Sequence, residues 1–287
     1  MRIICSVIFI SSVLILSCSC ESVTAPQKLN APRNLTLSWE WDGIYLSWVE
    51  NNVNEDGYII FRNDSEIFRT DKNINSFVDH SFIPLEPLRY YVVAFRDDEI
   101  SGESNTDSIA IALEFFDDFE DGYNAGWIGY PAQSVLKNID GCLNINGVND
   151  DGKAHVASFY RSLDLPLTYG ATMTKIDGYA TEPFGLAIFT LNDTTALNFL
   201  MAQTGSWNII EEKEEPRLIA SGKSLKISGV SNDMRICICP EKMKVYVNDY
   251  ELKSLDYQFA EQAHWFALYT QRNLSINFDN VYLFQNY

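Results

Sequence analysis

The sequence predicts an all-β protein in which two β-sandwich units follow an export signal. Three observations support this. Apolar and polar residues alternate in short runs from residue 31 to residue 287. Turn residues separate the runs at intervals of roughly 8–12 residues, and the runs lack the period of a helix. Hydrophobic residues make up 46 % of the 287 residues and aromatic residues 13 %, which is enough to build packed cores and excludes a chain disordered throughout.

The N-terminal segment has the pattern of a secretory signal. Met1 and Arg2 give it a positive start, and an apolar run follows over residues 3–16. The run ends in small residues, where a signal peptidase can cut. It is too short and wrongly flanked for a membrane-spanning helix. We therefore expect residues 1–20 to direct export and to carry the processing site.

Cys18 is the candidate lipidation site. The segment Ile15-Leu16-Ser17-Cys18 resembles the lipobox of bacterial lipoproteins, in which the cysteine receives a lipid and becomes the first residue. The resemblance implies a membrane-anchored lipoprotein of the cell envelope or cell surface. The alternative is an ordinary signal peptide cut near Cys20. Residues 21–30 are polar and include Pro26, so we expect them to form a tether.

The charge balance excludes one class of partner. The chain has 39 Asp and Glu residues against 21 Lys and Arg residues, a formal net charge of −18. Such a chain repels phosphate backbones, and no basic patch with interleaved aromatic residues offsets this. We expect no nucleic-acid partner, and the expected contact with a membrane is through the lipid alone.

The first unit is expected over residues 31–113. Strands are predicted at residues 44–48, 57–62, 76–79 and 88–95. Alternation in the first of these places Ile44, Leu46 and Trp48 on one face. In the last, Leu88 and Tyr90 begin a similar apolar face. Several short strands bounded by turn residues indicate a β-sandwich.

These segments resemble a fibronectin type III domain. The resemblance rests on residues 31–35, 46–48, 56–62, 90–94 and 102–104, taken in that order. It implies a spacer or docking module without chemistry of its own, with Trp48 as the core tryptophan. The family's corner tyrosine falls on Leu88 here, so we expect its hydroxyl-to-backbone bond to be missing.

The second unit is expected over residues 114–287. Its opening at residues 115–127 and its close at residues 278–284 carry matching aromatic and acidic signatures, with predicted strands between them. This arrangement resembles the concanavalin A-like lectin and laminin-G jelly roll. The resemblance implies a second, larger β-sandwich in which the first and last strands pair.

Exposed aromatic residues are the candidates for a ligand-binding surface. Sugars pack their C–H faces on aromatic rings, and their hydroxyls need polar partners. The candidate residues are Trp207, Trp265, Tyr269, Trp127 and Tyr130. Trp207 follows Gly205 and Ser206 at an expected turn, and both a surface and a core position remain open for it. For Trp127, inside the opening signature, a core position is favoured.

Three carboxylates are candidate ligands for a structural calcium ion. Asp117, Asp118 and Asp279 converge if the terminal strands pair, and calcium prefers oxygen ligands. The alternative is local, with Asp279 ending a turn while Asp117 and Asp118 cap an edge strand. Nothing in the sequence requires a cofactor. The spacing of Cys237 and Cys239 does not suit zinc, and the sequence leaves open whether either pairs with Cys142.

The sequence offers no catalytic centre. Glycoside hydrolases of this fold carry alternate carboxylates on one strand in the order E-x-D-x-E, and no such run exists here. The densest acidic run, at residues 211–215, ends in Pro216 and is expected to be a solvated loop. We expect a non-enzymatic surface protein whose second unit binds a polysaccharide or other surface polymer. A structural or protein-binding component without a glycan site is the alternative, and a glycoside hydrolase ranks third.

Overall fold

The computed structural model describes residues 28–122, 126–130, 136–147, 155–190, 195–259 and 262–285. The described chain contains strands β1–β23 and no helix. No helix long and apolar enough to cross a membrane is therefore found in it. The export signal and Cys18 lie outside the described residues, so these remain predictions.

Strands β1–β8 form the smaller unit, a sandwich of two antiparallel sheets. One sheet has the order β1-β2-β5 and the other the order β4-β3-β6-β7, with β8 also paired to β6. The strands are β1 (Arg33–Glu40), β2 (Gly43–Val49), β3 (Gly57–Arg62), β4 (Ser65–Arg69), β5 (Ser76–Asp79), β6 (Leu88–Arg96), β7 (Glu99–Ile100) and β8 (Asp107–Ile109). Ile44, Leu46 and Trp48 are buried in its core, as their alternation predicts.

Tyr90, two positions after Leu88, supplies a buried hydroxyl that links the two sheets of this sandwich. Leu88 is an apolar core residue and offers no hydroxyl. Tyr90 is fully buried, and its hydroxyl donates to Asp79 Oδ2 at 2.8 Å. Arg62 Nη1 donates to the same oxygen at 2.6 Å. A side-chain network therefore ties β3, β5 and β6 together.

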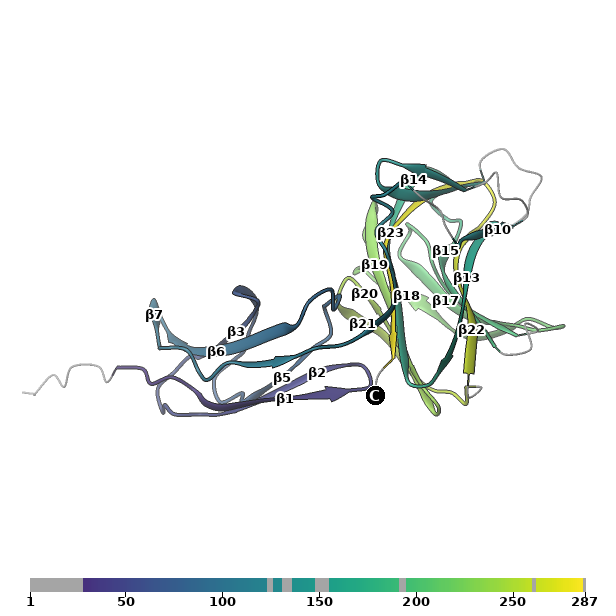
Figure 1. The fold of residues 1–287 in the computed structure, drawn as a ribbon. Helices are drawn as coiled ribbons and strands as arrows, with labels where there is room; N and C mark the ends of the chain where they lie inside the picture. The colour runs from purple at the N-terminus through teal and green to yellow at the C-terminus, as the bar shows by residue number, and fades with distance from the viewer. Residues whose placement is uncertain are drawn as a thin grey trace, which may run out of the picture.

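Strands β9–β23 form the larger unit, in which two sheets pack face to face (Figure 1). The seven-stranded sheet has the order β10-β13-β22-β15-β16-β17-β18, and the eight-stranded sheet has the order β11-β12-β23-β14-β19-β20-β21 with β9 paired to β23. The strands are β9 (Leu113–Asp117), β10 (Ile128–Tyr130), β11 (Leu136–Ile139), β12 (Cys142–Asn146), β13 (His155–Asp164), β14 (Leu167–Gly178), β15 (Phe184–Thr190), β16 (Ala196–Met201), β17 (Ser206–Glu212), β18 (Arg217–Lys223), β19 (Ser231–Cys239), β20 (Lys242–Val247), β21 (Tyr250–Asp256), β22 (Gln262–Thr270) and β23 (Leu274–Gln285). The first and last strands pair, with Asp117 opposite Val281, as expected.

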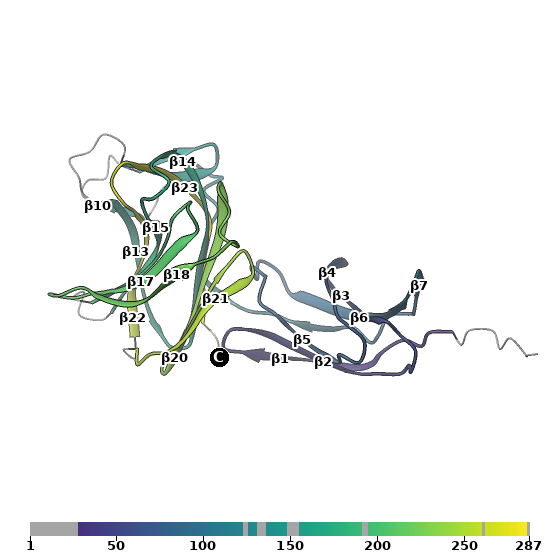
Figure 2. The same cartoon turned by 180° about the vertical axis from the view of Figure 1, so that it is seen from behind.

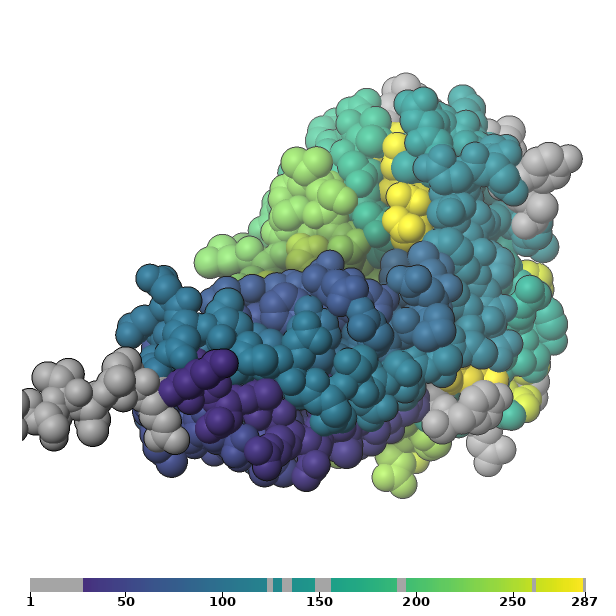
Figure 3. All heavy atoms as spheres, turned by 60° about the vertical axis from the view of Figure 1, so that its left-hand side comes forward, coloured from purple at the N-terminus to yellow at the C-terminus, as the bar shows by residue number. Residues whose placement is uncertain are grey.

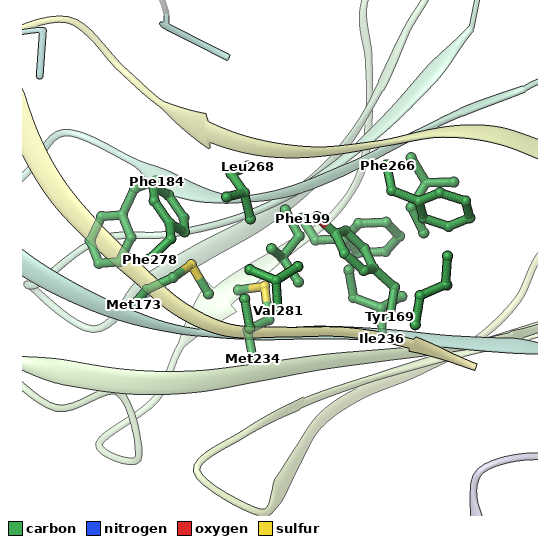
Figure 4. Packing of buried hydrophobic residues seen from close by; sticks show 14 of the residues in the cluster. Tyr169, Met173, Phe184, Phe199, Met234, Ile236, Phe266, Leu268, Phe278 and Val281 are labelled. Carbon is green, nitrogen blue, oxygen red and sulfur yellow. The ribbon is translucent and has the colours of Figure 1, made fainter. Parts of the chain in front are cut away.

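Alternating side chains from both sheets fill the space between them (Figure 4). Phe266 and Leu268 point inward from β22, and Ile236 and Met234 point inward from β19. Because successive strand residues face opposite sides, their neighbours point outward from the sandwich. The outer face of each sheet is therefore available for contacts.

The smaller unit docks on the outer face of the eight-stranded sheet (Figures 1 and 2). Phe284 of β23 packs against Trp39 and Phe82, with ring centroids 5.7 and 6.1 Å apart. Asp42, in the turn between β1 and β2, accepts hydrogen bonds from Lys244 Nζ at 2.7 Å and from the Tyr246 hydroxyl at 2.8 Å. The two units thus share an apolar and hydrogen-bonded interface. In Figure 3 the smaller unit, purple to blue, lies in front of the larger unit.

Candidate functional site

The face of the seven-stranded sheet turned away from the core is the candidate site, and we call it the outward face. On β22, Phe266 and Leu268 belong to the core, so Trp265, Ala267 and Tyr269 project outward. The smaller unit covers the other sheet. Trp265 and Tyr269, the pair predicted from the sequence, therefore lie together on the side of the seven-stranded sheet that faces away from the other sheet.

An aromatic row crosses this face. Trp265 lies opposite Tyr160 of β13 and opposite Phe189 of β15 in the strand register. The rings of Tyr160 and Trp265 meet edge to face, with centroids 5.3 Å apart. Tyr160 is 50 % exposed. We call Tyr160, Trp265 and Phe189 the aromatic row.

Small residues form the floor beside the aromatic row. Ser158, Ala267 and Ala187 face one another on β13, β22 and β15. The two alanines point outward and yet are at most 1 % exposed, because larger neighbours stand above them. A surface pocket of about 240 Å³ results, lined by Ile128, Ser158, Phe189 and Trp265. Its walls are mostly apolar, which suits the C–H face of a ring-shaped ligand.

Two β-bulges flank Trp265. The register of β13 against β22 shifts between Tyr160 and Leu163, and that of β15 against β22 shifts between Phe189 and Thr190. A bulge bends its strand and re-aims the local side chains. The bulges therefore set the angle at which Trp265 meets its neighbours in the aromatic row.

Polar groups lie on the same face. Asn198 Nδ2 donates to Glu212 Oε1 at 3.4 Å, and the Tyr269 hydroxyl donates to Gln271 Oε1 at 2.7 Å. Burial raises the pKa of Tyr269, and the nearby carboxylates of Glu212 and Glu182 raise it further. These groups can accept or donate hydrogen bonds to ligand hydroxyls.

Trp207 does not join Trp265. It lies on β17 on the same side as Ile209, where it packs partly buried against the core of the larger unit. Its ring covers Gly222 of β18, since a Cβ at that glycine would stand 2.7 Å from Trp207 Cζ2. The two tryptophans occupy opposite faces of one sheet. Of the two positions that the sequence leaves open for Trp207, the structure shows the one against the core.

We predict that Trp207→Ala lowers stability. Removing a partly buried indole leaves a void beside Ile209, so we expect a loss of about 2 kcal/mol in the free energy of unfolding, below the 3–5 kcal/mol of a fully buried tryptophan. Urea denaturation measures this loss. An unchanged unfolding midpoint would show that Trp207 is a surface residue after all.

Trp127 and Tyr130, neighbours in sequence, have different surroundings. Trp127 is 3 % exposed, and its Nε1 donates to Asp117 Oδ2 at 2.8 Å. It is a core residue, as favoured from the sequence, and is not available to a ligand. Tyr130 is 65 % exposed and ends β10 at the edge of the outward face.

The three predicted calcium ligands are engaged locally. Asp117 accepts from Trp127 and from the backbone N–H of Phe119, whereas Asp279 accepts from the backbone and side chain of Asn280. Asp118 Oδ1 accepts from the N–H of Glu120. In the described part of the chain, no group of three or more His, Cys, Asp or Glu side chains is placed to hold a metal ion. Of the two alternatives, the structure therefore supports the local one, in which the three carboxylates form turns and caps and do not bind calcium.

Burial also governs the acid–base properties of this region. It raises the pKa of Asp117 and of Asp279, and neighbouring carboxylates raise both further.

Cys142, Cys237 and Cys239 are free thiols, so no disulfide joins them. Cys237 is fully buried on the face that meets the smaller unit, where burial raises its pKa.

Sequence reasoning missed Tyr160, Phe189 and Ile128. Each lies on a short strand whose alternation alone marks it as outward, but only the strand register shows that it neighbours Trp265. A usable signal was the set of small residues Ser158, Ala187 and Ala267 in otherwise bulky strands. Small side chains at outward positions indicate a depression in the face of a sheet.

Comparisons with known proteins support the fold of the larger unit. No protein-family model matches the chain, and no curated protein matches it. A solved structure described as an endo-acting O-glycanase of the human gut microbiota has a TM-score of 0.50 at 9 % identity, covering 61 % of this chain and 99 % of its own. An endo-β-1,3-glucanase from Pyrococcus furiosus has a TM-score of 0.49 at 10 % identity and covers 61 % and 94 %. A carbohydrate-binding module from Bacillus subtilis has a TM-score of 0.47 at 12 % identity and covers 56 % and 96 %.

The similarity extends to the fold and no further. Identities across the similar structures are 8–12 %, and similarity at this level shows the fold alone. The chain is all-β, and its larger unit is a jelly-roll β-sandwich. A fold does not determine function, so the site has to be judged by its own geometry.

Proposed function

We propose that the larger unit binds a carbohydrate polymer on its outward face, without catalysis. The observation that carries this proposal is the pocket between Trp265, Phe189 and Ile128, walled by apolar groups and edged by exposed Tyr160. A sugar ring laid over this pocket would pack its C–H face on the indole. Asn198 on β16 and Glu212 on β17 lie further along the same cross-strand rows, where they would bind hydroxyls of a neighbouring sugar unit of the polymer.

The carboxylates favour binding over hydrolysis. Glycoside hydrolysis needs a pair of carboxyl groups facing each other across the scissile bond. In the described cross-strand rows that carry Trp265 and Ala267, Glu212 is the one carboxylate. The acidic residue next to it, Glu211, turns to the other side, where it accepts from Tyr257 and pairs with Lys213 and Arg217.

We further propose that a lipid on Cys18 anchors the chain in a bacterial cell envelope, followed by a tether. The tether is shorter than the expected residues 21–30, because Leu29 is 2 % exposed and its backbone N–H donates to Glu99 Oε1 at 3.1 Å. The smaller unit then acts as a fibronectin type III spacer. Its two sheets, of the orders β1-β2-β5 and β4-β3-β6-β7, are compatible with that family. Such a spacer would hold the outward face away from the membrane. Metabolic labelling with a radioactive fatty acid tests the anchor, because a Cys18→Ser variant should lose the label.

Trp265→Ala tests the proposed function. The full chain is incubated with a panel of insoluble polysaccharides, and the retained fraction is measured with and without calcium. We expect retention on at least one polysaccharide and at least a tenfold weaker affinity for Trp265→Ala, because the largest apolar surface of the pocket is gone. The matched control is Tyr45→Ala, which removes an aromatic ring 37 % exposed in the smaller unit and should bind as the wild type does.

Three outcomes contradict the proposal in whole or in part. Failure of the folded wild type on every polysaccharide would favour a structural or protein-binding role. Equal retention of wild type and Trp265→Ala would place the binding surface elsewhere. Release of reducing ends from a retained polysaccharide would contradict the non-catalytic part alone.

A further inference from the structure

A second pocket, of about 220 Å³, lies where the smaller unit meets the eight-stranded sheet. Residues 81–83 of the smaller unit close one side, and strands β14, β19, β20 and β23 close the other. Six of the lining side chains determine its chemistry, namely Phe82, Tyr246, Tyr282, Asp233, Arg235 and Asp249. This pocket belongs to the sheet opposite the outward face, so it is separate from the Trp265 pocket.

Arg235 is the unusual group in this pocket. It is 6 % exposed, and its guanidinium lies 4.6 Å from the ring centroid of Tyr246. Neither Nε nor Nη2 has a hydrogen-bond partner in the described chain, although both atoms are buried. Buried N–H donors without acceptors are strongly unfavourable. Because Arg235 also lines the pocket, a ligand there that offers acceptor oxygens would reduce this cost.

The surrounding charges define that ligand further. Asp233 Oδ1 accepts from the Thr172 hydroxyl at 2.6 Å, which leaves its second oxygen available. Burial raises the pKa of Asp249. The charge of Arg235 lowers this pKa, and the charge of Asp233 raises it. One cation and two carboxylates give the pocket a net negative charge, which disfavours an anionic ligand. A neutral ligand with both donors and acceptors satisfies all three groups.

We propose that this pocket between the two units binds one neutral sugar unit through adjacent hydroxyl groups. The sugar oxygens accept from Arg235, and the hydroxyls donate to Asp233 and Asp249. Phe82 and Tyr282 supply apolar surface for the C–H face. The volume is below the roughly 300–1,000 Å³ of pockets for larger ligands, so a single unit fits better than an oligomer.

The test observes the arginine Nε–H signals of the full-length protein by ¹H–¹⁵N NMR. The protein is titrated with glucose, galactose, mannose, xylose and, as an anion, glucuronate. The Arg235 signal is identified by its absence from the spectrum of Arg235→Met. We expect this signal to shift in a saturable way with at least one neutral sugar.

Asp249→Asn provides the second variant. Asp249 lies in a hairpin turn with a φ of 64°, and asparagine tolerates that backbone conformation. The variant should therefore fold, and we expect it to bind the same sugar at least fivefold more weakly. It keeps the test decisive even if Arg235→Met does not fold. The control Arg217→Met removes an arginine that pairs with Glu211 on the other side of the unit, and it should leave the titration unchanged.

Trp265→Ala separates this site from the outward face. We expect that variant to show the full shift at Arg235 even though it no longer retains polysaccharide. No saturable shift with any neutral sugar would overturn the proposal and indicate that water alone occupies the pocket. A shift with glucuronate only would overturn it in favour of an anion site.

Discussion

Trp127→Ala is expected to lower the free energy of unfolding by about 3–5 kcal/mol, the range found when a buried tryptophan is truncated. Trp127 is surrounded by the rings of Phe115, Phe119 and Phe159, with centroids 5.0–5.8 Å away. Its removal opens a cavity among them. It also takes the indole N–H from Asp117 Oδ2, so a half-buried carboxylate loses a donor. Urea denaturation monitored by circular dichroism measures the loss.

Trp127→Phe separates the contribution of the ring volume to stability from that of the indole hydrogen bond. Phenylalanine keeps most of the ring volume and loses the hydrogen bond, so we expect a loss of about 1–3 kcal/mol. Binding to polysaccharide should not change for the folded fraction of either variant. A stability loss below 1 kcal/mol for Trp127→Ala, together with weaker polysaccharide retention, would show that this residue belongs to the ligand site.

Asp42→Ala is expected to uncouple the two units. Asp42 is 7 % exposed and accepts from Lys244 and Tyr246 across the interface. Its removal leaves the Tyr246 hydroxyl without this acceptor, and Lys244 keeps only the carboxylate of Glu251 at 3.7 Å. Breaking a buried pair from one side destabilises by about 3–5 kcal/mol, and we expect a loss below this range because Lys244 is partly exposed and keeps Glu251. We expect a lower unfolding midpoint for the smaller unit and a separate calorimetric transition. One transition at the wild-type midpoint would show that the apolar contact of Phe284 with Trp39 and Phe82 holds the units by itself.

The same contact predicts an acid dependence. Burial alone would raise the pKa of Asp42, but the hydrogen bonds from Lys244 and Tyr246 outweigh it and hold the pKa below its usual 3.8. A carboxyl group with a lowered folded-state pKa stabilises above its unfolded-state pKa, and this stabilisation disappears as the pH falls through the folded-state value. From about pH 5 to about pH 2, the wild type should therefore lose more stability than Asp42→Asn. Parallel pH profiles of the two proteins would contradict this assignment.

Local sequence patterns predicted the all-β fold because alternation and turn residues report directly on strands. The pairing of the terminal strands was also predictable, since both carry recognisable signatures. The same alternation set Trp265 and Tyr269 on one face. At Trp207 the preceding glycine turn favours an exposed side chain, whereas the alternation with Ile209 favours a buried one. The structure agrees with the alternation.

Side-chain contacts between residues distant in sequence were not predictable. Asp42 and Lys244 are 202 positions apart, and nothing near either residue indicates the other. The aromatic row likewise depends on the register of three strands that are not consecutive in the chain. The Arg235 pocket exists only because one unit docks on the other, so a reading of either unit alone does not reveal it.

A crystal structure of the full chain with an oligosaccharide of the polymer it retains would test the central claim most directly. We expect a sugar ring stacked on Trp265, over the floor of Ser158, Ala187 and Ala267, and a neighbouring sugar unit with hydroxyls near Asn198 or Glu212. An oligosaccharide bound away from the outward face, with the Trp265 pocket empty, would contradict it.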